Sequence, residues 1–381
     1  MKYIVFGAPQ ITQDDIDEVV DTLKSGWIGT GPKVKKFEAA FAQYKETQTN
    51  HAIAVNSCTA ALQISMRAID IQPGDEVITT PLTFCATVNA IIHSGATPVL
   101  ADVDPNTWNI NPAEIEKKIT PKTKAIIPVH YTGLMCDMEK ITSIAKKHKL
   151  LIIEDCAHAI ETKSALGHAG TIGDFGCFSF YVTKNLVTAE GGMVLAKSTE
   201  YTDRIKRLAL HGMSKDAWHR FSDTGYVHYT VEEPGYKFNM TDIQAALGVQ
   251  QIKRVETNWK KRQEIWHRYQ EAFKDLDVRL PLDAPKGEIH GYHLFPIVLN
   301  QPPKKTRETI ISDLHEKNIG TGVHYLSLPE HHYYKNTYGW QGEDYPVATD
   351  IGRNTFSIPL SPSLTEDEIK YIIDQVRSEL V

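Results

Sequence analysis

The feature of this sequence that most restricts its fold is a series of short, uninterrupted apolar segments between about residues 51 and 200. They lie at residues 51–55, 76–80, 97–101, 124–129 and 150–155 and alternate with helical patterns. A strand with one wet face alternates apolar and polar residues, whereas a strand buried on both faces is apolar throughout. The segments therefore predict an α/β fold with a mostly parallel sheet and helices on both of its faces.

The rest of the chain predicts a second, smaller unit. A long helical region runs from residue 240 to about residue 273. Two strand patterns and one helical pattern follow it, at residues 293–298, 356–360 and 305–317. We expect a large α/β domain over residues 1–250, which includes the N-terminal segment. Residues 251–381 then hold the long helix and a small C-terminal α+β domain, as the chain length allows.

Composition and charge exclude several classes of protein. The formal net charge is −6, and the lysine-rich stretches are interspersed with apolar residues, so no nucleic-acid partner is expected. The N-terminal apolar run is too short for a signal peptide, and no run is long enough to span a bilayer. The five cysteines form no CxxC pair, and His324, His331 and His332 have no further ligand at metal-site spacing. We expect a cytoplasmic protein without a membrane partner or a metal.

Residues that can bind a ligand follow the first two of these strands. In open α/β sheets, ligands bind beyond the carboxyl ends of the strands. Residues 56–61, NSCTAA, lie between a strand and a helix, where free backbone N–H groups attract an anion. Ordinary helix capping is the alternative interpretation of this segment. Phe84 follows the next strand, and its ring either stacks on a planar ligand or packs in the core.

A carboxylate and a lysine follow two further strands. Asp155 ends a strongly apolar strand, so its carboxylate needs a positive or hydrogen-bonding partner; a helix cap is the alternative. Lys184 follows the apolar run 178–181 and has hydroxyl side chains on both sides. A lysine amine with a lowered pKa forms Schiff bases with aldehydes, although a lysine at a strand end also commonly extends to solvent. A phosphate cradle, an aromatic face, a carboxylate and a lysine together meet the requirements of pyridoxal 5′-phosphate (PLP).

Several ordered motifs extend this interpretation over nearly the whole chain. They include SGWIGTGP (25–32), NSCTAAL (56–62), EDCAHA (154–159), GCFSFYVTKNLVTAEGG (176–192) and GYKFNMTDIQAALGVQQ (235–251). With these motifs the chain resembles the DegT/DnrJ/EryC1/StrS family of sugar aminotransferases. That resemblance implies the fold-type-I, aspartate aminotransferase-like architecture and PLP as the cofactor.

The resemblance also implies roles for individual residues. Lys184 is the catalytic residue, which bonds to the cofactor aldehyde and carries a proton, and Asp155 pairs with the pyridinium nitrogen. His158 lies near the ring hydroxyl, and Asn239 reaches the phosphate bound to the neighbouring subunit. The full set of expected cofactor-binding residues is Ser57, Cys58, Thr59, Phe84, Asp155, His158, Ser179, Lys184 and Asn239. At Cys58 the family usually has Gly or Ala, and at Tyr181 many members have His.

The expected reaction follows from the same resemblance. L-Glutamate donates an amino group to the 4-keto carbon of a nucleotide-linked 4-keto-6-deoxysugar, or a related 4-keto sugar, in a homodimer with shared active sites. The candidate substrate-binding residues are Trp27, Thr30, Arg220, Lys237, His324 and Tyr325. The alternatives are a 3-keto sugar aminotransferase, a PLP-dependent lyase or dehydratase, and a non-catalytic PLP-binding regulator. A nicotinamide dehydrogenase is disfavoured because no G-x-G-x-x-G follows a strand.

Overall fold

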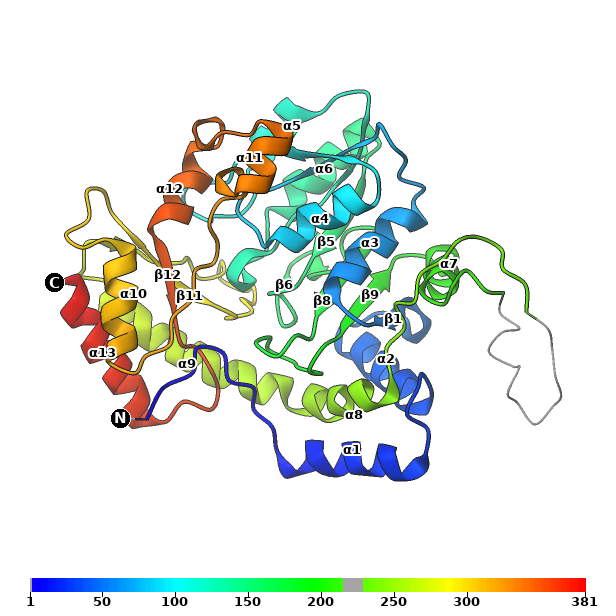
Figure 1. Cartoon of the computed structure of the whole chain (residues 1–381), viewed down its shortest axis with the longest axis horizontal. Coiled ribbons are helices and arrows are strands. Elements are labelled where there is room, and N and C mark those ends of the chain that lie inside the picture. Colours follow the sequence, from blue (N-terminus) through cyan, green and yellow to red (C-terminus); the bar gives the residue numbers. More distant parts are fainter. Residues whose placement is uncertain (1, 215–228) are drawn as a thin grey trace.

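The computed structural model describes residues 2–214 and 229–381, and its largest element within these residues is a seven-stranded sheet (Figure 1). The strand order is β1-β9-β8-β5-β4-β2-β3. Strand β9 runs antiparallel to its neighbours β1 and β8, and the other neighbouring pairs are parallel. The strands are β1 (Ala52–Val55), β2 (Glu76–Thr79), β3 (Thr97–Leu100), β4 (Thr123–Ile126), β5 (Leu151–Asp155), β8 (Phe175–Ser179) and β9 (Gly192–Ala196). The predicted α/β fold with a mostly parallel sheet is confirmed.

Helices cover both faces of this sheet, as the uninterrupted apolar strands predicted. On one face lie α3 (Cys58–Ala68), α4 (Cys85–His93) and α7 (Thr199–Ala209). On the other face lie α2 (Pro32–Tyr44), α5 (Pro112–Lys118), α6 (Met138–His148) and α8 (Asp242–Gln251). Consecutive strand residues enter different cores: Val194 packs with the first group of helices, and Met193 packs with the second.

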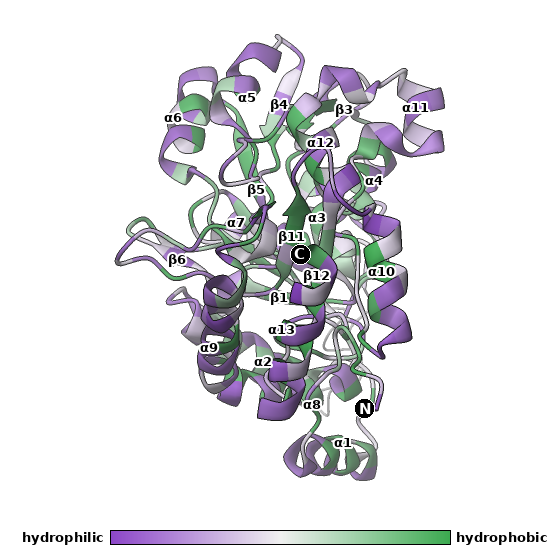
Figure 2. Cartoon of the chain, turned by 90° about the vertical axis from the view of Figure 1, so that its left-hand side faces the viewer, coloured by the Kyte–Doolittle hydropathy of each residue, from purple (hydrophilic) through white to green (hydrophobic). Residues whose placement is uncertain are grey.

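The C-terminal part is built on a three-stranded antiparallel sheet. Its order is β10 (Val278–Arg279), β11 (Phe295–Leu299), β12 (Thr355–Ile358). The helices α9 (Val255–Phe273), α10 (Arg307–Glu316) and α13 (Glu366–Leu380) pack on it around a core that is rich in aromatic rings. In Figure 2 the strands of both sheets are largely hydrophobic and the outer helices carry hydrophilic residues. The predicted domain division at residue 250 stays a prediction.

Two expected elements differ from the observed ones. The long helical region predicted from residue 240 to about residue 273 consists of two helices, α8 and α9, which a 3-10 turn at Ile252–Arg254 separates. The strand predicted from residue 293 begins at Phe295. The preceding backbone is used elsewhere, because the N–H of His293 donates to the Thr132 carbonyl (2.9 Å) and that of Gly291 to the Gly133 carbonyl (2.8 Å). These contacts keep residues 291–293 out of the small sheet and beside the large one.

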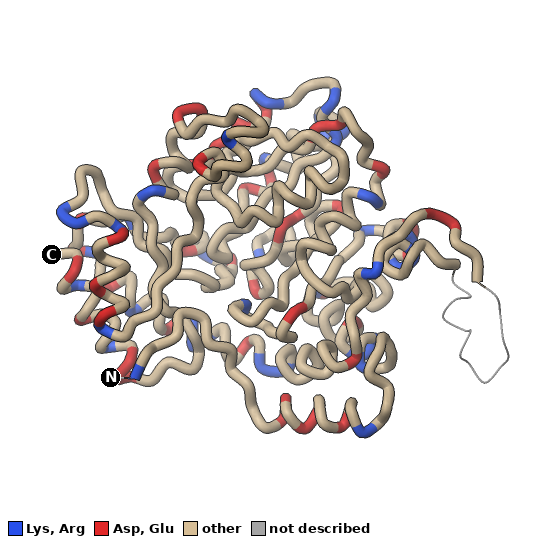
Figure 3. The backbone as a smooth tube through the Cα atoms, in the orientation of Figure 1, with Lys and Arg blue, Asp and Glu red and all other residues tan. Residues whose placement is uncertain are grey.

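Charged residues of both signs are interspersed along the backbone (Figure 3). None of the helices in the described part of the chain is both long and apolar enough to cross a membrane. The first helix, α1 (Gln13–Ser25), lies below α8 in Figure 1 and packs against it.

Candidate active site

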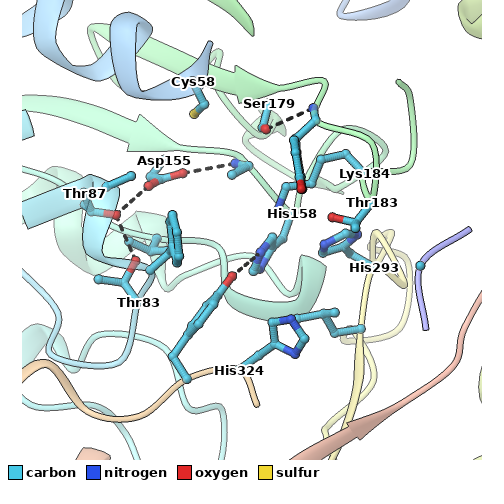
Figure 4. A pocket seen from close by; sticks show the side chains of 18 of the residues that line it. Cys58, Thr83, Thr87, Asp155, His158, Ser179, Thr183, Lys184, His293 and His324 are labelled. Atoms are coloured by element: carbon cyan, nitrogen blue, oxygen red, sulfur yellow. Dashed lines mark hydrogen bonds between the residues drawn. The ribbon is translucent and has the colours of Figure 1, made fainter. Parts of the chain in front are cut away.

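A cavity of about 530 Å³ lies at the carboxyl ends of β1, β5 and β8 (Figure 4). Segments that follow these strands form one side of it, and residues 324–325 and the end of β12 form the other. Most of the residues predicted from the sequence line this one cavity: Ser57, Cys58, Thr59, Phe84, Asp155, His158, Ser179, Lys184, His324 and Tyr325. Positions far apart in the sequence thus meet where the strand ends predicted that they would.

One end of the cavity is suited to an anion. Helix α3 begins at Cys58, and the Ser57 hydroxyl caps it by accepting from the Ala60 N–H (3.1 Å). The first amides of a helix have no acceptor within the helix, so those of Cys58 and Thr59 are free to bind a ligand. A Cβ at Gly192 would lie 2.5 Å from the Ser57 backbone, so only glycine allows β9 to pass this close to the turn.

Asp155 is held at the end of β5 by two donors. The Thr87 hydroxyl donates to one carboxylate oxygen (2.9 Å), and the Ala157 N–H donates to the other (3.1 Å). Burial raises the pKa of Asp155, whereas these two donors and the positive charge of Lys184 oppose the rise. The carboxylate is therefore fixed in orientation and is short of a cationic partner.

Lys184 follows a turn in which its N–H donates to the Tyr181 carbonyl (2.8 Å), and its side chain borders the cavity. Burial lowers the pKa of Lys184 to about 8, while Cys58 and Asp155 act in the opposite direction. About a tenth of this amine is therefore neutral at pH 7, and a neutral amine is what a Schiff-base nucleophile requires.

Aromatic side chains form part of the remaining walls. Phe84 is 57% exposed, so its ring is open to the cavity rather than packed in the core. The Tyr325 hydroxyl lies 3.0 Å from His158 Nε2, whereas His158 Nδ1 is buried and has no partner in the described part of the chain. The Phe6 ring stacks on His324 with 5.1 Å between the ring centroids. An orphaned buried nitrogen beside an exposed ring indicates a place for a planar polar ligand.

Four predicted residues do not line this cavity. Trp27, Thr30 and Asn239 form a separate contact, in which the Trp27 indole donates to the Thr30 carbonyl (3.1 Å) and the Asn239 amide to the Thr30 hydroxyl (2.6 Å). Lys237 is exposed nearby, where its carbonyl accepts from Asn56 (3.3 Å). Arg220 lies outside the described residues. Within one chain Trp27, Thr30 and Lys237 lie outside this cavity, because the loop at 25–31 packs against the start of α8, and their role in substrate binding stays a prediction.

Comparison with known proteins identifies the family. The DegT/DnrJ/EryC1/StrS aminotransferase family profile matches residues 9–377. The chain belongs to this family. It is 46% identical to the spore coat polysaccharide biosynthesis protein SpsC of Bacillus subtilis (strain 168) over 379 residues, which cover 98% of this chain and 96% of SpsC.

Solved structures agree with this assignment. The sugar aminotransferase Spr1654 of Streptococcus pneumoniae, described as putative, superposes in its PLP form with a TM-score of 0.92 at 33% identity over 100% of both chains. Helicobacter pylori PseC, an aminotransferase involved in the biosynthesis of pseudoaminic acid, gives 0.90 at 28% identity over 100% of this chain and 99% of that chain. The fold is therefore that of a fold-type-I PLP enzyme, and the chain is a PLP-dependent member of a sugar aminotransferase family.

The residues present in the cavity fit PLP. The free amides at the start of α3 suit its phosphate, the exposed Phe84 ring suits its pyridine face, and the Asp155 carboxylate forms no ion pair within the described residues. The Nδ1 of His158 is buried without a hydrogen-bond partner in the described part of the chain, and the ligand can supply that partner. The individual cofactor-binding roles, including that of Asn239, stay predictions.

Thr87, Phe6 and His293 are among the residues of the cavity wall that sequence reasoning missed. Thr87 lies one helical turn after Phe84, so it was predictable as the second polar residue at the start of α4. Phe6 and His293 reach the cavity from segments distant in sequence, and neither belongs to a motif whose chemistry pointed there.

Proposed function

We propose that this protein transfers an amino group from L-glutamate to the 4-keto carbon of a nucleotide-linked 4-keto-6-deoxysugar or a related 4-keto sugar. The observation that carries the proposal is the meeting of Lys184 and Asp155 in one cavity, whose other polar lining includes several hydroxyl side chains and the rings of His158, His293, His324 and Tyr325. Among the described lining residues Lys184 is the only lysine or arginine, so most of the wall is uncharged and suits a sugar. The roles of SpsC in spore coat polysaccharide and of PseC in pseudoaminic acid biosynthesis support a glycan substrate.

The side chains of this protein divide the work of the reaction. PLP, when bound, supplies an electron sink for the carbanion formed at the α-carbon of the amino acid. The Lys184 Nζ accepts the proton that leaves this α-carbon, because a pKa of about 8 leaves part of the amine neutral. The donors Thr87 and Ala157 keep the Asp155 carboxylate available, so it holds a proton on the pyridine nitrogen.

Other residues bind the phosphate group of the cofactor or exclude water from the cavity. The amides of Cys58 and Thr59, with the Ser179 hydroxyl at the end of β8, hold the phosphate group. The rings of Phe6 and Tyr325 cover the cavity on the side of the C-terminal sheet and limit the access of water to the reacting atoms.

We further propose a homodimer in which each subunit completes the active site of the other. On α1 the apolar side chains of Ile16, Val20 and Leu23 share one exposed stripe, while the polar Asp15 and Thr22 are buried. This arrangement is inverted with respect to an ordinary surface helix and suits a partner of the same kind. The stripe continues into exposed Trp27, whose loop holds Asn239 outside the cavity of its own chain.

Mixing two inactive variants tests the shared site. If Asn239 serves the partner's cavity, Lys184→Ala and Asn239→Leu are each inactive as homodimers, and random mixing restores about one quarter of wild-type activity. The regained activity comes from heterodimers, in which one of the two sites has both native residues. No recovery in a mixture that native mass spectrometry shows to contain heterodimers contradicts the shared site.

The reaction is tested with ¹⁵N-labelled L-glutamate and thymidine-diphosphate-linked 4-keto-6-deoxyglucose or its uridine-linked N-acetyl counterpart. We expect NMR of the product to place the label on C4 of the sugar, and Lys184→Ala to give no labelled sugar. Label on C3 from a 3-keto substrate supports the alternative regiochemistry. Loss of a substituent without label transfer supports a lyase or dehydratase, and binding of PLP without turnover supports a regulator.

A further inference from the structure

His293 borders the active-site cavity from the segment just before β11, and no motif assigned it a role. It is 6% exposed, and its ring lies against that of His158 with 4.4 Å between the centroids (Figure 4). Its backbone N–H donates to the Thr132 carbonyl (2.9 Å), so the residue is fixed at its main chain.

The side chain of Asn185 determines which nitrogen of this ring carries the proton. Asn185 Nδ2 faces only acceptors: the Glu161 carboxylate oxygens (3.1 and 2.9 Å) and the Gly291 carbonyl (2.8 Å). The Asn185 Oδ1 must therefore be the atom that lies 3.0 Å from His293 Nδ1. Because this oxygen accepts, Nδ1 of His293 donates and bears the hydrogen.

A buried ion pair fixes Asn185 in this orientation. Arg262 of α9 pairs with Glu161, and both side chains are almost fully buried. The Glu161 carboxylate is thereby held against the side-chain amide of Asn185. Asn185 directly follows Lys184 in the chain. The network Arg262–Glu161–Asn185–His293 thus connects the long helix to the cavity wall.

The other ring nitrogen, Nε2, has no protein partner in the described part of the chain. Burial and the positive charges of Lys184 and Arg262 lower the pKa of His293 well below its usual range, so the ring is neutral. A neutral imidazole whose Nδ1 bears the hydrogen presents at Nε2 a lone pair and no proton. Such an atom accepts a hydrogen bond from O–H or N–H and repels carboxylate and phosphate oxygens.

We propose that His293 is a specificity-determining residue that accepts, at Nε2, a hydrogen bond from a hydroxyl group of the keto-sugar, with its tautomer fixed by Asn185. This inference rests on the proposed sugar substrate. A buried site built around such a bond discriminates strongly against ligands that lack the donor, because the acceptor is then left unpaired. Of the two substrates, the sugar offers several hydroxyl donors. Glutamate offers only its α-amino group, which is the group transferred, because its carboxylates accept.

The substitutions His293→Asn and His293→Gln test the two ring nitrogens separately. An Asn side chain places its amide near the position of Nδ1 and can keep the contact with Asn185, whereas a Gln side chain reaches the position of Nε2 and can still accept from a substrate. The exposed residue His332 supplies the control His332→Asn. Each variant is measured in two single-turnover reactions, with L-glutamate and with thymidine-diphosphate-linked 4-keto-6-deoxyglucose, and in thermal unfolding.

We expect His293→Asn to lose about 30- to 100-fold in kcat/KM for the sugar half-reaction, and His293→Gln to retain within about tenfold of wild type. Both should react with L-glutamate within about threefold of wild type, and His293→Asn should be the more heat-stable of the two. If His293→Asn and wild type react equally well with the sugar, the proposal is overturned, because the sugar then needs no acceptor at the position of Nε2. An equal loss in both half-reactions also overturns it, since the donor is then the Lys184 amine or the cofactor. Failure of the wild type with the sugar but not with glutamate refutes the proposed substrate instead.

Discussion

The reactivity of Lys184 should depend on pH in a way that separates it from every exposed lysine. Burial lowers the pKa of Lys184 from 10.5 to about 8. At pH 7 a pKa of about 8 leaves about 9% of the amine neutral, whereas a pKa of 10.5 leaves about 0.03%, a difference of about 300-fold. Burial in the cavity thus raises the neutral fraction of the Lys184 amine, which is the form that attacks an aldehyde, at physiological pH.

The assay is the rate at which the cofactor-free protein bonds to PLP, measured by borohydride reduction and mass spectrometry of the Lys184 peptide. The rate should rise about fivefold from pH 7 to 8 and less than twofold from pH 8 to 9, as the amine becomes fully neutral. Lys140 is an internal reference, because its ion pair with Asp137 raises its pKa and its labelling should still climb at pH 10. A Lys184 rate that increases tenfold per pH unit up to pH 10 refutes the reasoning.

Three further predictions concern the same site. Lys184→Met should stabilise the cofactor-free protein by about 1 to 3 kcal/mol at pH 7 in urea unfolding, because it removes the cost of burying a charged amine. Since the pKa of Lys184 is about 8 in the folded protein and 10.5 in the unfolded chain, this cost is complete below pH 8 and absent above pH 10.5. An equal effect at pH 7 and pH 11 contradicts the prediction. Thr87→Val removes a donor from Asp155, so the pKa of Asp155 rises and the glutamate half-reaction slows by about tenfold on the acid side of its pH profile. Thr83→Val should have a smaller effect, because the Thr83 hydroxyl bonds to the Thr87 hydroxyl (2.9 Å) and not to Asp155 itself. Glu161→Gln should lower the free energy of unfolding by about 3 to 5 kcal/mol at fixed protein concentration, since Arg262 is left buried without a counter-charge. The double variant Glu161→Gln with Arg262→Met should recover most of this loss, and no recovery argues against the ion pair.

The sequence predicted the strand ends well because parallel strands bring their carboxyl ends to one edge. Asp155 and Ser179 end β5 and β8, which are neighbours in the sheet, so apolar runs followed by polar residues were sufficient to place them together. Lys184 was placed at the same edge because it follows an apolar run, residues 178–181. The capping of α3 by Ser57 was also visible as a local pattern, because helix caps depend only on neighbouring residues.

The remaining parts of the site depend on contacts that no local pattern encodes. His293 meets Asn185 across 108 positions, and this pairing arises only when the segment before β11 bonds to the Thr132 turn. Trp27 was expected at the pocket but lies beside it within one chain, because the loop before α2 packs on the start of α8; Asn239, expected to serve the neighbouring subunit, bonds to the same loop. The sequence also did not predict the direction of β9. An antiparallel strand that is buried on both faces has the same uninterrupted apolar pattern as a parallel one.

The most direct test of the account is the absorption spectrum of the purified protein with PLP, followed through two additions. L-Glutamate should remove the visible band of the cofactor bonded to Lys184, and a nucleotide-linked 4-keto-6-deoxysugar should restore it, whereas Lys184→Ala should show neither change. A band that glutamate bleaches but no keto-sugar restores contradicts the sugar 4-aminotransferase assignment. A wild-type protein that takes up no PLP contradicts the role given to Lys184 and Asp155.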